Sequence, residues 1–164
     1  MNRLNRLVTA VNTTALLPAA AKPAALSLLF NSQVKMAFTC GIQIQELSAQ
    51  RAQLALRNRR RVQNHIGGVH ACGMALLAES ASGVVFGMNV RDSCIPVIKS
   101  MSIRYTKRAQ GDLQAVATLT PAQIQEINSK DKGEVLVDVQ VTDATGAAPI
   151  ECEMLWAWIS KTRK

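Results

Sequence analysis

The chain has 164 residues, of which 48% are hydrophobic and 18% charged, so its composition excludes an intrinsically disordered protein. This length suits one domain with a substantial buried core. The net charge of +8 is confined to one part of the chain, because residues 1–61 contain nine Lys or Arg and one acid, whereas residues 62–164 contain ten of each. We therefore expect any anionic partner at the N-terminal part.

The first 36 residues contain no acid and place Leu4, Leu7, Val8 and Val11 at helical spacing. This pattern predicts helices over about 2–12 and 23–31, which would form an N-terminal helical extension over residues 1–33. An organellar presequence has a similar composition and is the alternative reading. Proline and lysine interrupt the apolar stretches, so we expect no membrane span.

From residue 34 the hydrophobic pattern changes its period. Apolar residues alternate over 34–44, which predicts a strand, and a second strand over about 52–57 would complete a hairpin through a turn at 48–51. The segment 69–88 is apolar on nearly every side, so it predicts a helix enclosed by other structure. Four further strands are predicted at about 95–107, 112–119, 134–142 and 149–160, with a capped helical turn at Thr120-Pro121.

This order of elements predicts an α+β fold, in which an antiparallel sheet over residues 34–164 wraps around one long central helix. The cysteines form no C-x-x-C pair, which argues against zinc-finger and thioredoxin-like motifs. We expect buried free thiols in a reducing, cytoplasmic setting. The four cysteines are Cys40, Cys72, Cys94 and Cys152.

Reactive side chains gather in residues 64–79. Both histidines of the chain, His65 and His70, lie there beside a glycine pair, and a lone carboxylate, Glu79, follows inside a run of Ala and Leu. Burying such a carboxylate is unfavourable unless it is paired, protonated or used. The window is therefore the first candidate for a functional site.

The pattern Asn64-x-x-Gly67-x-Val69-His70, with an acid nine residues after the histidine, resembles the hotdog-fold thioesterases. It is similar to their phenylacetate-pathway-type branch, which carries Asn-x-x-Gly-x-x-His-Gly-Gly and then Leu-Ala-Asp, where this chain has Leu77-Ala78-Glu79. An uncharacterised bacterial thioesterase-like family looks nearer still, because it shares Arg-Arg-Arg-Val-x-Asn-His and His-Ala. The resemblance extends over about residues 34–160.

This resemblance implies hydrolysis of an acyl-coenzyme A thioester. By analogy, the N-H of Ala71, just after His70, polarises the thioester carbonyl, Asn64 holds the thioester or the water, and Glu79 is the general base or nucleophile. Nine helical residues put Glu79 about 13 Å from His70 and half a turn out of phase. Both groups can serve one site only if two chains contribute to it, so a homodimer, possibly a pair of dimers, is expected.

The same resemblance implies the substrate-binding residues. Gly68 and Cys72 would flank the carbonyl pocket, where Ala71-Cys72 replaces Gly-Gly and leaves less space. Ile98 takes the place of a Ser or Thr found in some relatives, and Ser100 is predicted to lie on the same strand face as a substitute. The coenzyme A arm would lie along a segment that includes Tyr105, Lys107 and Arg108. Coenzyme A would be part of the substrate, and no separate cofactor is expected.

Simpler interpretations remain open. Glu79 would then be a structural carboxylate paired with a neighbour, and Asn64 and His70 would be capping or core polar groups. We expect neither a metal site at His65, His70 and Cys72, because their spacing is unsuitable, nor a Cys72–His70 nucleophile. The overall alternative is a non-catalytic hotdog module that binds acyl-coenzyme A or another acyl ligand.

The basic run at residues 57–61 has two interpretations. It is read as a solvated strand end whose arginines are able to pair with coenzyme A phosphates. Nucleic acid is a less favoured partner, because the chain has only six aromatic residues and no recognised binding motif.

Overall fold

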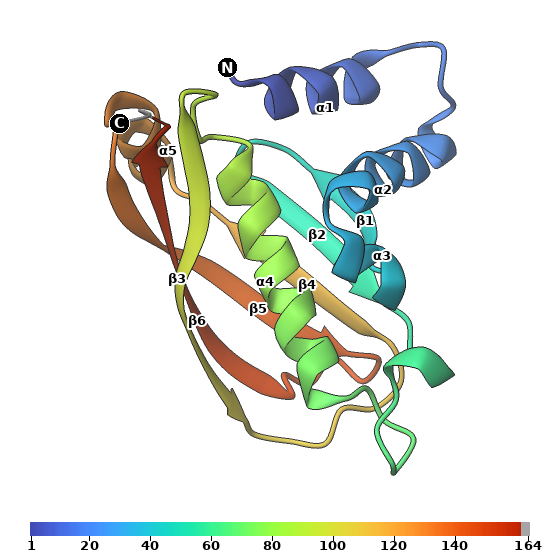
Figure 1. Ribbon diagram of the computed structural model, residues 1–164. Coiled ribbons are helices and arrows are strands. Elements are labelled where there is room, and N and C mark those ends of the chain that lie inside the picture. Colours follow the sequence, from blue (N-terminus) through green and yellow to red (C-terminus); the bar gives the residue numbers. More distant parts are fainter. Residues whose placement is uncertain (162–164) are drawn as a thin grey trace.

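The computed structural model describes residues 1–161 and shows a hotdog fold, in which a curved antiparallel sheet wraps around one central helix (Figure 1). The six strands are ordered β1-β2-β4-β5-β6-β3 across the sheet. Their bounds are Gln43–Leu47 (β1), Arg51–Leu56 (β2), Cys94–Tyr105 (β3), Leu113–Thr118 (β4), Gly133–Asp143 (β5) and Ile150–Ser160 (β6). The helices are Arg3–Thr13 (α1), Lys22–Gln33 (α2), Lys35–Cys40 (α3), Ala71–Gly87 (α4) and Pro121–Ser129 (α5), with 3-10 turns at Ala19–Ala21 (η1) and Arg60–Val62 (η2).

Helix α4 packs into the concave side of the sheet, as its uniformly apolar sequence predicted. Leu77, Ala81 and Phe86 are fully buried against it. The sheet approaches so closely that a Cβ at Gly83 would collide with the Trp156 indole, whose Nε1-H donates to Ser82 Oγ on the same helix (3.0 Å). Any side chain larger than hydrogen at position 83 would therefore push α4 away from β6.

The N-terminal residues form the two helices that were predicted over about 2–12 and 23–31, here α1 and α2. Asn2 caps α1 by accepting from the Asn5 N-H (2.8 Å), and its amide donates to the Gly87 carbonyl at the end of α4 (2.7 Å). Val8 is the buried residue of α1 and joins the hydrophobic core. The helix is thus fixed to the C-terminal end of α4 by polar and apolar contacts.

The predicted strand over 34–44 is wrong for most of its length, because residues 35–40 form α3. Met36 and Phe38 are 60% and 65% exposed, while Ala37 is fully buried. The alternating apolar residues are therefore not the buried side chains of this segment. The helix ends at Gly41, whose φ of +76° favours glycine. The strand of the hairpin starts only at Gln43.

The other predicted elements are confirmed to within two or three residues. The hairpin turn closes through Ser48 N-H to Arg51 O (2.8 Å). Thr120 and Gln123 form a reciprocal capping box at the start of α5. All four cysteines are free, but only Cys94 is buried as expected, whereas Cys40 and Cys152 are partly exposed and Cys72 is exposed.

The two edges of the sheet are finished differently. Helix α2 covers β1, since Ser27 Oγ accepts from the Ile44 N-H (2.8 Å) and Asn31 Nδ2 donates to the Ile42 carbonyl (3.0 Å). Strand β3 pairs only with β6 among residues 1–161, and its side chains are mostly exposed. In the same described range, no helix has the length and apolar character needed to cross a membrane.

Candidate active site

The loop before α4 is organised by the Asn64 side chain. Its Oδ1 accepts from the N-H groups of Ile66 (3.0 Å) and Gly68 (3.1 Å), and its backbone N-H donates to the Gly68 carbonyl (2.9 Å). The loop turns through Gly67 at a φ of +79°. Within residues 1–161, the Asn64 Nδ2 has no hydrogen-bond acceptor, so its two N-H donors are available to a ligand.

His70 is the N-cap of α4, which confirms a capping role for this side chain. Its Nδ1 accepts from the Cys72 N-H (3.1 Å), and this bond requires a neutral ring. The histidine therefore engages the backbone of Cys72, and no hydrogen bond joins it to the thiol in the part of the chain that the structure describes. A Cys72–His70 nucleophile gains no support from this geometry.

The cap leaves one donor free at the start of the helix. The N-H groups of Cys72, Gly73 and Met74 are all taken by His70, through its ring or its carbonyl. The Ala71 N-H has no acceptor among the described residues. Because it lies at the positive end of the α4 dipole, it is suited to stabilise an oxyanion.

Glu79 lies half-buried in the middle of α4. Burial raises the pKa of its carboxyl above the ordinary value. No Lys, Arg or His within residues 1–161 forms an ion pair with it. The carboxylate is thus not neutralised by a structural partner, which argues against the reading of Glu79 as one half of a salt bridge.

An open stripe runs along α4, and Glu79 is its one charged residue. The stripe is the part of the helix that the sheet leaves accessible, and in Figure 1 no other element covers it in front. Cys72 lies seven residues before Glu79, which places it on the same side of the helix, about 10 Å away. The accessible residues of the stripe are Ala71, Cys72, Ala75, Leu76 and Glu79, and Trp156 of β6 closes the stripe at Gly83.

Tyr105 at the end of β3 closes over the start of α4. Its hydroxyl donates to the Ala71 carbonyl (3.0 Å), and partial burial raises the pKa of Tyr105, with a smaller contribution from the Cys72 thiol. The structure therefore brings together Ala71, Cys72 and Tyr105, three of the residues that the resemblance implied. Lys107 lies two residues further on and is exposed.

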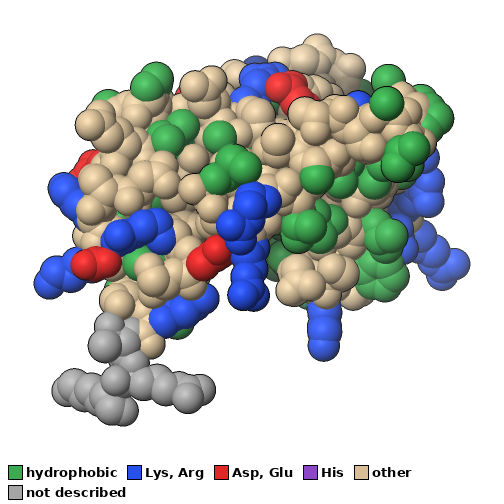
Figure 2. Space-filling view, turned by 90° about the horizontal axis from the view of Figure 1, so that it is seen from above, with side chains coloured by type: hydrophobic (Ala, Val, Ile, Leu, Met, Phe, Trp, Pro, Cys, Tyr) green, Lys and Arg blue, Asp and Glu red, His purple; other side chains and the backbone are tan. Residues whose placement is uncertain are grey.

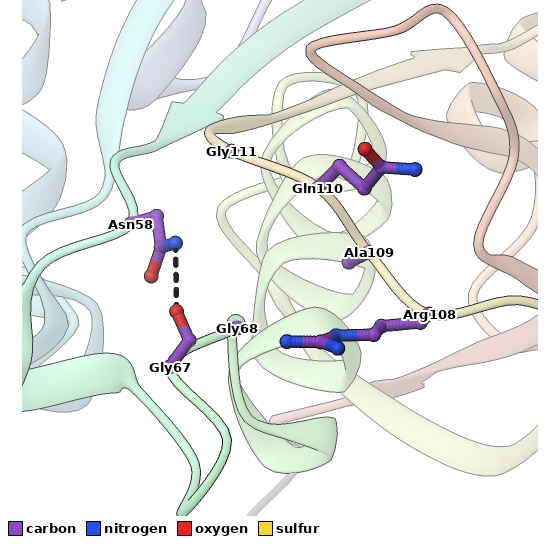
Figure 3. Close-up of a pocket in the computed structure, with 7 residues that line it drawn as sticks. All are labelled: Asn58, Gly67, Gly68, Arg108, Ala109, Gln110 and Gly111. Carbon is purple, nitrogen blue, oxygen red and sulfur yellow. Dashed lines mark hydrogen bonds between the residues drawn. The ribbon is translucent and has the colours of Figure 1, made fainter.

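A small cavity of about 400 Å³ opens beside the loop at Gly68 (Figure 3). Arg108 reaches across it and donates to the Ile66 carbonyl (2.9 Å). On the opposite side, the Asn58 amide donates to the Gly67 carbonyl (3.1 Å), while its Oδ1 is buried without a hydrogen-bond partner in the described structure. The lining residues are Asn58, Gly67, Gly68, Arg108, Ala109, Gln110 and Gly111.

Of these lining residues, Gly68 and Arg108 belong to the site implied by the resemblance. Asn58 and Gln110 were missed by sequence reasoning. Asn58 stands inside a run of arginines, and its role depends on a contact with a loop nine residues away, which no local pattern signals.

The expected position of Ser100 is wrong. The register of β3 against β6 shifts between Ile98 and Ser100, so that Ile98 pairs with Trp156 but Ser100 pairs with Leu155. Trp156 is buried and faces inward, whereas Leu155 belongs to the outer face. Met101, which pairs with buried Met154, takes the inward position that a hydroxyl was expected to hold.

The groups do not all meet within one chain. Asn64, Ala71 and Tyr105 lie around the start of α4, and Glu79 lies more than two turns along the helix. Residues 1–161 contain no group of three or more His, Cys, Asp or Glu arranged to hold a metal ion. The features at hand define a hotdog-fold protein with a half-buried carboxylate and a separate set of free N-H donors.

The chain belongs to the family described as a domain of unknown function, DUF4442, whose family model matches residues 23–159. A similar solved structure is that of PA5026 from Pseudomonas aeruginosa, a protein of unknown function described as a probable thioesterase. It is 23% identical, with a TM-score of 0.75 over 88% of this chain and 97% of that one. The thioesterase HI1161 from Haemophilus influenzae is 12% identical, with a TM-score of 0.68 over 86% and 92% of the two chains.

At these identities the similarity establishes the fold, which is the hotdog fold that the motif predicted. No curated protein matches the sequence.

Proposed function

We propose that the protein is a homodimeric acyl-coenzyme A thioesterase-like hydrolase, related to the phenylacetate-pathway-type branch of the hotdog enzymes. The observation that carries this proposal is Glu79, a half-buried carboxylate on an accessible stripe of α4 without an ion-pair partner among the described residues. Similarity to the structures of PA5026 and HI1161 supports the general class. A raised pKa makes the ionised carboxylate a stronger base than an exposed glutamate.

The open edge of the sheet supports the dimer. β3 is a twelve-residue edge strand whose outer backbone groups are unpaired within residues 1–161, and a long unpaired edge is a template for pairing with another chain. Val97, Met101 and Tyr105 on this strand are 39%, 49% and 48% exposed. Two β3 edges joined around a two-fold axis would cover these side chains and bring the α4 helices of both protomers close together.

In such a dimer, each site combines groups from both chains. The Ala71 N-H and the Asn64 Nδ2 of one protomer polarise the thioester carbonyl, where negative charge develops. Glu79 of the other protomer removes a proton from water, or attacks the carbonyl itself. The separation of these groups along α4 is what makes the second chain necessary.

We assign the coenzyme A end of the substrate to the cavity at Gly68. Arg108 lies across this cavity and Lys107 is exposed beside it, so both cations are within reach of phosphate groups. The unsatisfied Asn58 Oδ1 would accept an N-H group, such as the amides of the pantetheine arm.

A non-catalytic module that binds acyl-coenzyme A is the second candidate, and the inward face of β3 favours it. Ile98, Met101 and Ile103 are apolar where some related enzymes use a hydroxyl to orient water. A site without that hydroxyl can still bind a thioester, but the water that would attack the thioester is less well oriented.

The test is hydrolysis of a panel of short, aromatic and long acyl-coenzyme A esters. We expect Glu79→Gln to lower kcat by about 100-fold or more, the usual contribution of a general base. The matched control is Glu153→Gln, which removes an exposed carboxylate from the outer face of β6. If no ester is hydrolysed but the esters bind, the second candidate is correct; if Glu79→Gln is as fast as wild type, Glu79 is not the base.

A further inference from the structure

A second concave surface lies at the opposite edge of the sheet from β3 and shares no residue with the candidate active site. This groove, of about 770 Å³, lies between α2, α3, β1 and the segment that follows β2. We refer to it as the α2–α3 groove. Its size is that of a small-molecule site, about 300–1,000 Å³. Its lining residues include Pro23, Ala24, Leu28, Phe38, Arg57, Arg59 and Arg61.

One wall of the groove is apolar and unusually exposed. Leu28 is 72% and Phe38 65% exposed, although α2 packs against β1 and α3 packs against α2 and α4. Pro23 and Ala24 continue this wall along the same side of α2. Side chains of this size gain favourable free energy when a ligand removes them from water.

The other wall is cationic. Arg57, Arg59 and Arg61 line it, and none of the three forms an ion pair or a side-chain hydrogen bond with any described residue. No Asp or Glu lines the groove, and the chain has no acid before Glu46. Figure 2 shows hydrophobic and basic side chains next to each other in its right-hand part, which is the side of α2 and α3 in Figure 1.

Two details show that the groove is part of the ordered fold. The Arg61 guanidinium packs over Gly41, where a Cβ would collide with it, so this arginine is positioned by the backbone at the end of α3. Asn31, whose amide donates to Ile42, has a buried Oδ1 without a partner in the described residues, and Asn31 also lines the groove.

From these observations we infer that the α2–α3 groove binds a single-chain anionic amphiphile, with its alkyl chain along Leu28 and Phe38 and its anionic head on the three arginines. A carboxylate or phosphate head matches the paired N-H donors of guanidinium groups. Because the surface is concave, it fits one molecule taken from solution, whereas a bilayer requires protruding apolar side chains. The site operates independently of Glu79.

The test is calorimetric titration of the full-length chain with sodium dodecanoate below its micelle concentration. We expect one molecule bound per protomer, and affinity at least about tenfold lower in Arg59→Gln, since this variant loses a charge-assisted hydrogen bond to the anionic head. Leu28→Asn should weaken binding as well, because it makes the apolar wall polar. Both side chains are exposed, so both variants should keep the wild-type melting temperature.

Arg60→Gln is the matched control, since Arg60 belongs to the same basic run but does not line the groove. Its affinity should equal that of wild type, and dodecyltrimethylammonium, which has the same chain and a cationic head, should not bind. The inference is overturned if dodecanoate does not bind to the wild-type protein. It is also overturned if Arg59→Gln and Leu28→Asn bind dodecanoate with the wild-type affinity.

Two further outcomes also overturn it. Arg59-dependent binding to phosphatidylglycerol vesicles without binding of monomeric dodecanoate would identify a membrane surface. Arg59-dependent binding of free coenzyme A that dodecanoate does not displace would identify a nucleotide site. The Glu79→Gln variant, in contrast, should lose thioester hydrolysis and still bind dodecanoate with the wild-type affinity. The result for one proposal is therefore independent of the result for the other.

Discussion

The two edges of the sheet differ in what completes them. At β1, the protein's own helix α2 supplies polar groups to the strand, through Ser27 to Ile44 and through Asn31 to Ile42. At β3, twelve residues end the sheet without a pairing partner among residues 1–161, and the side chains of Ile95, Val97, Met101 and Tyr105 are exposed there.

In the proposed dimer, this difference makes β3 the edge that would pair with the second chain. An edge that the chain itself has covered is protected from pairing, whereas an uncovered apolar edge is a site for another strand. The free donors of Asn64 and Ala71 lie far from the Glu79 carboxylate along α4, so the proposed mechanism requires a second chain. The uncovered edge and the divided site therefore point to the same dimer.

Changing β3 should have the largest effect. We expect Met101→Lys to weaken the dimer by about tenfold or more and to lower thioesterase activity in parallel, because like charges would face each other across the two-fold axis. Analytical ultracentrifugation measures the dimer. Leu136→Lys is the control, since Leu136 is equally exposed (51%) but lies on β5, away from the edge. A Met101→Lys protein that dimerises as wild type would exclude pairing through β3.

Changing the covered edge should affect stability instead. Ser27→Ala leaves the Ile44 N-H of β1 without its acceptor, which should lower the free energy of unfolding by about 1–3 kcal/mol, measured by urea denaturation. Ser32→Ala on the same helix removes only two local bonds, one donated to the Leu29 carbonyl and one accepted from the Gln33 amide, and should change stability by less than about 0.5 kcal/mol. Equal effects of the two substitutions would show that α2 does not hold the β1 edge.

The smallest expected effect is the pH dependence of stability contributed by Glu79. Its pKa is raised in the folded state above the ordinary 4.5, so its contribution is fully present at lower pH and is lost as pH rises through the folded pKa. Glu79→Gln should therefore raise the melting temperature relative to wild type more at about pH 8 than at about pH 4. A difference that does not change with pH would mean that the carboxyl is not desolvated.

Much of the fold was predictable because its signals are local. The apolar run of α4 predicts an enclosed helix, and the capping box at Thr120 predicts the start of α5. The segment 34–44 was misread because Met36 and Phe38 mimic a strand pattern while lying exposed on a helix. The glycine at position 41, which ends α3 in a left-handed conformation, was the residue that could have indicated a helix end in this segment.

The candidate site was predictable only in part. The positions of Asn64, His70 and Glu79 follow from the motif, and the half-turn between His70 and Glu79 follows from helix geometry. The register shift in β3 moved Ser100 to the outer face, and a bulge of this kind leaves no reliable trace in a single sequence. Asn58 joins the cavity through a contact between loops, which depends on the completed fold.

Mixed dimers test the central claim, that each site is built from two chains, most directly. Asn64→Asp keeps the Oδ1 that holds the loop and removes the Nδ2 donors, whereas Glu79→Gln removes the base. Each variant alone should be nearly inactive. After co-refolding in equal amounts, half of the dimers carry one intact site, so activity should recover to about a quarter of wild type. Activity that stays at the level of the separate variants would contradict a site shared between protomers.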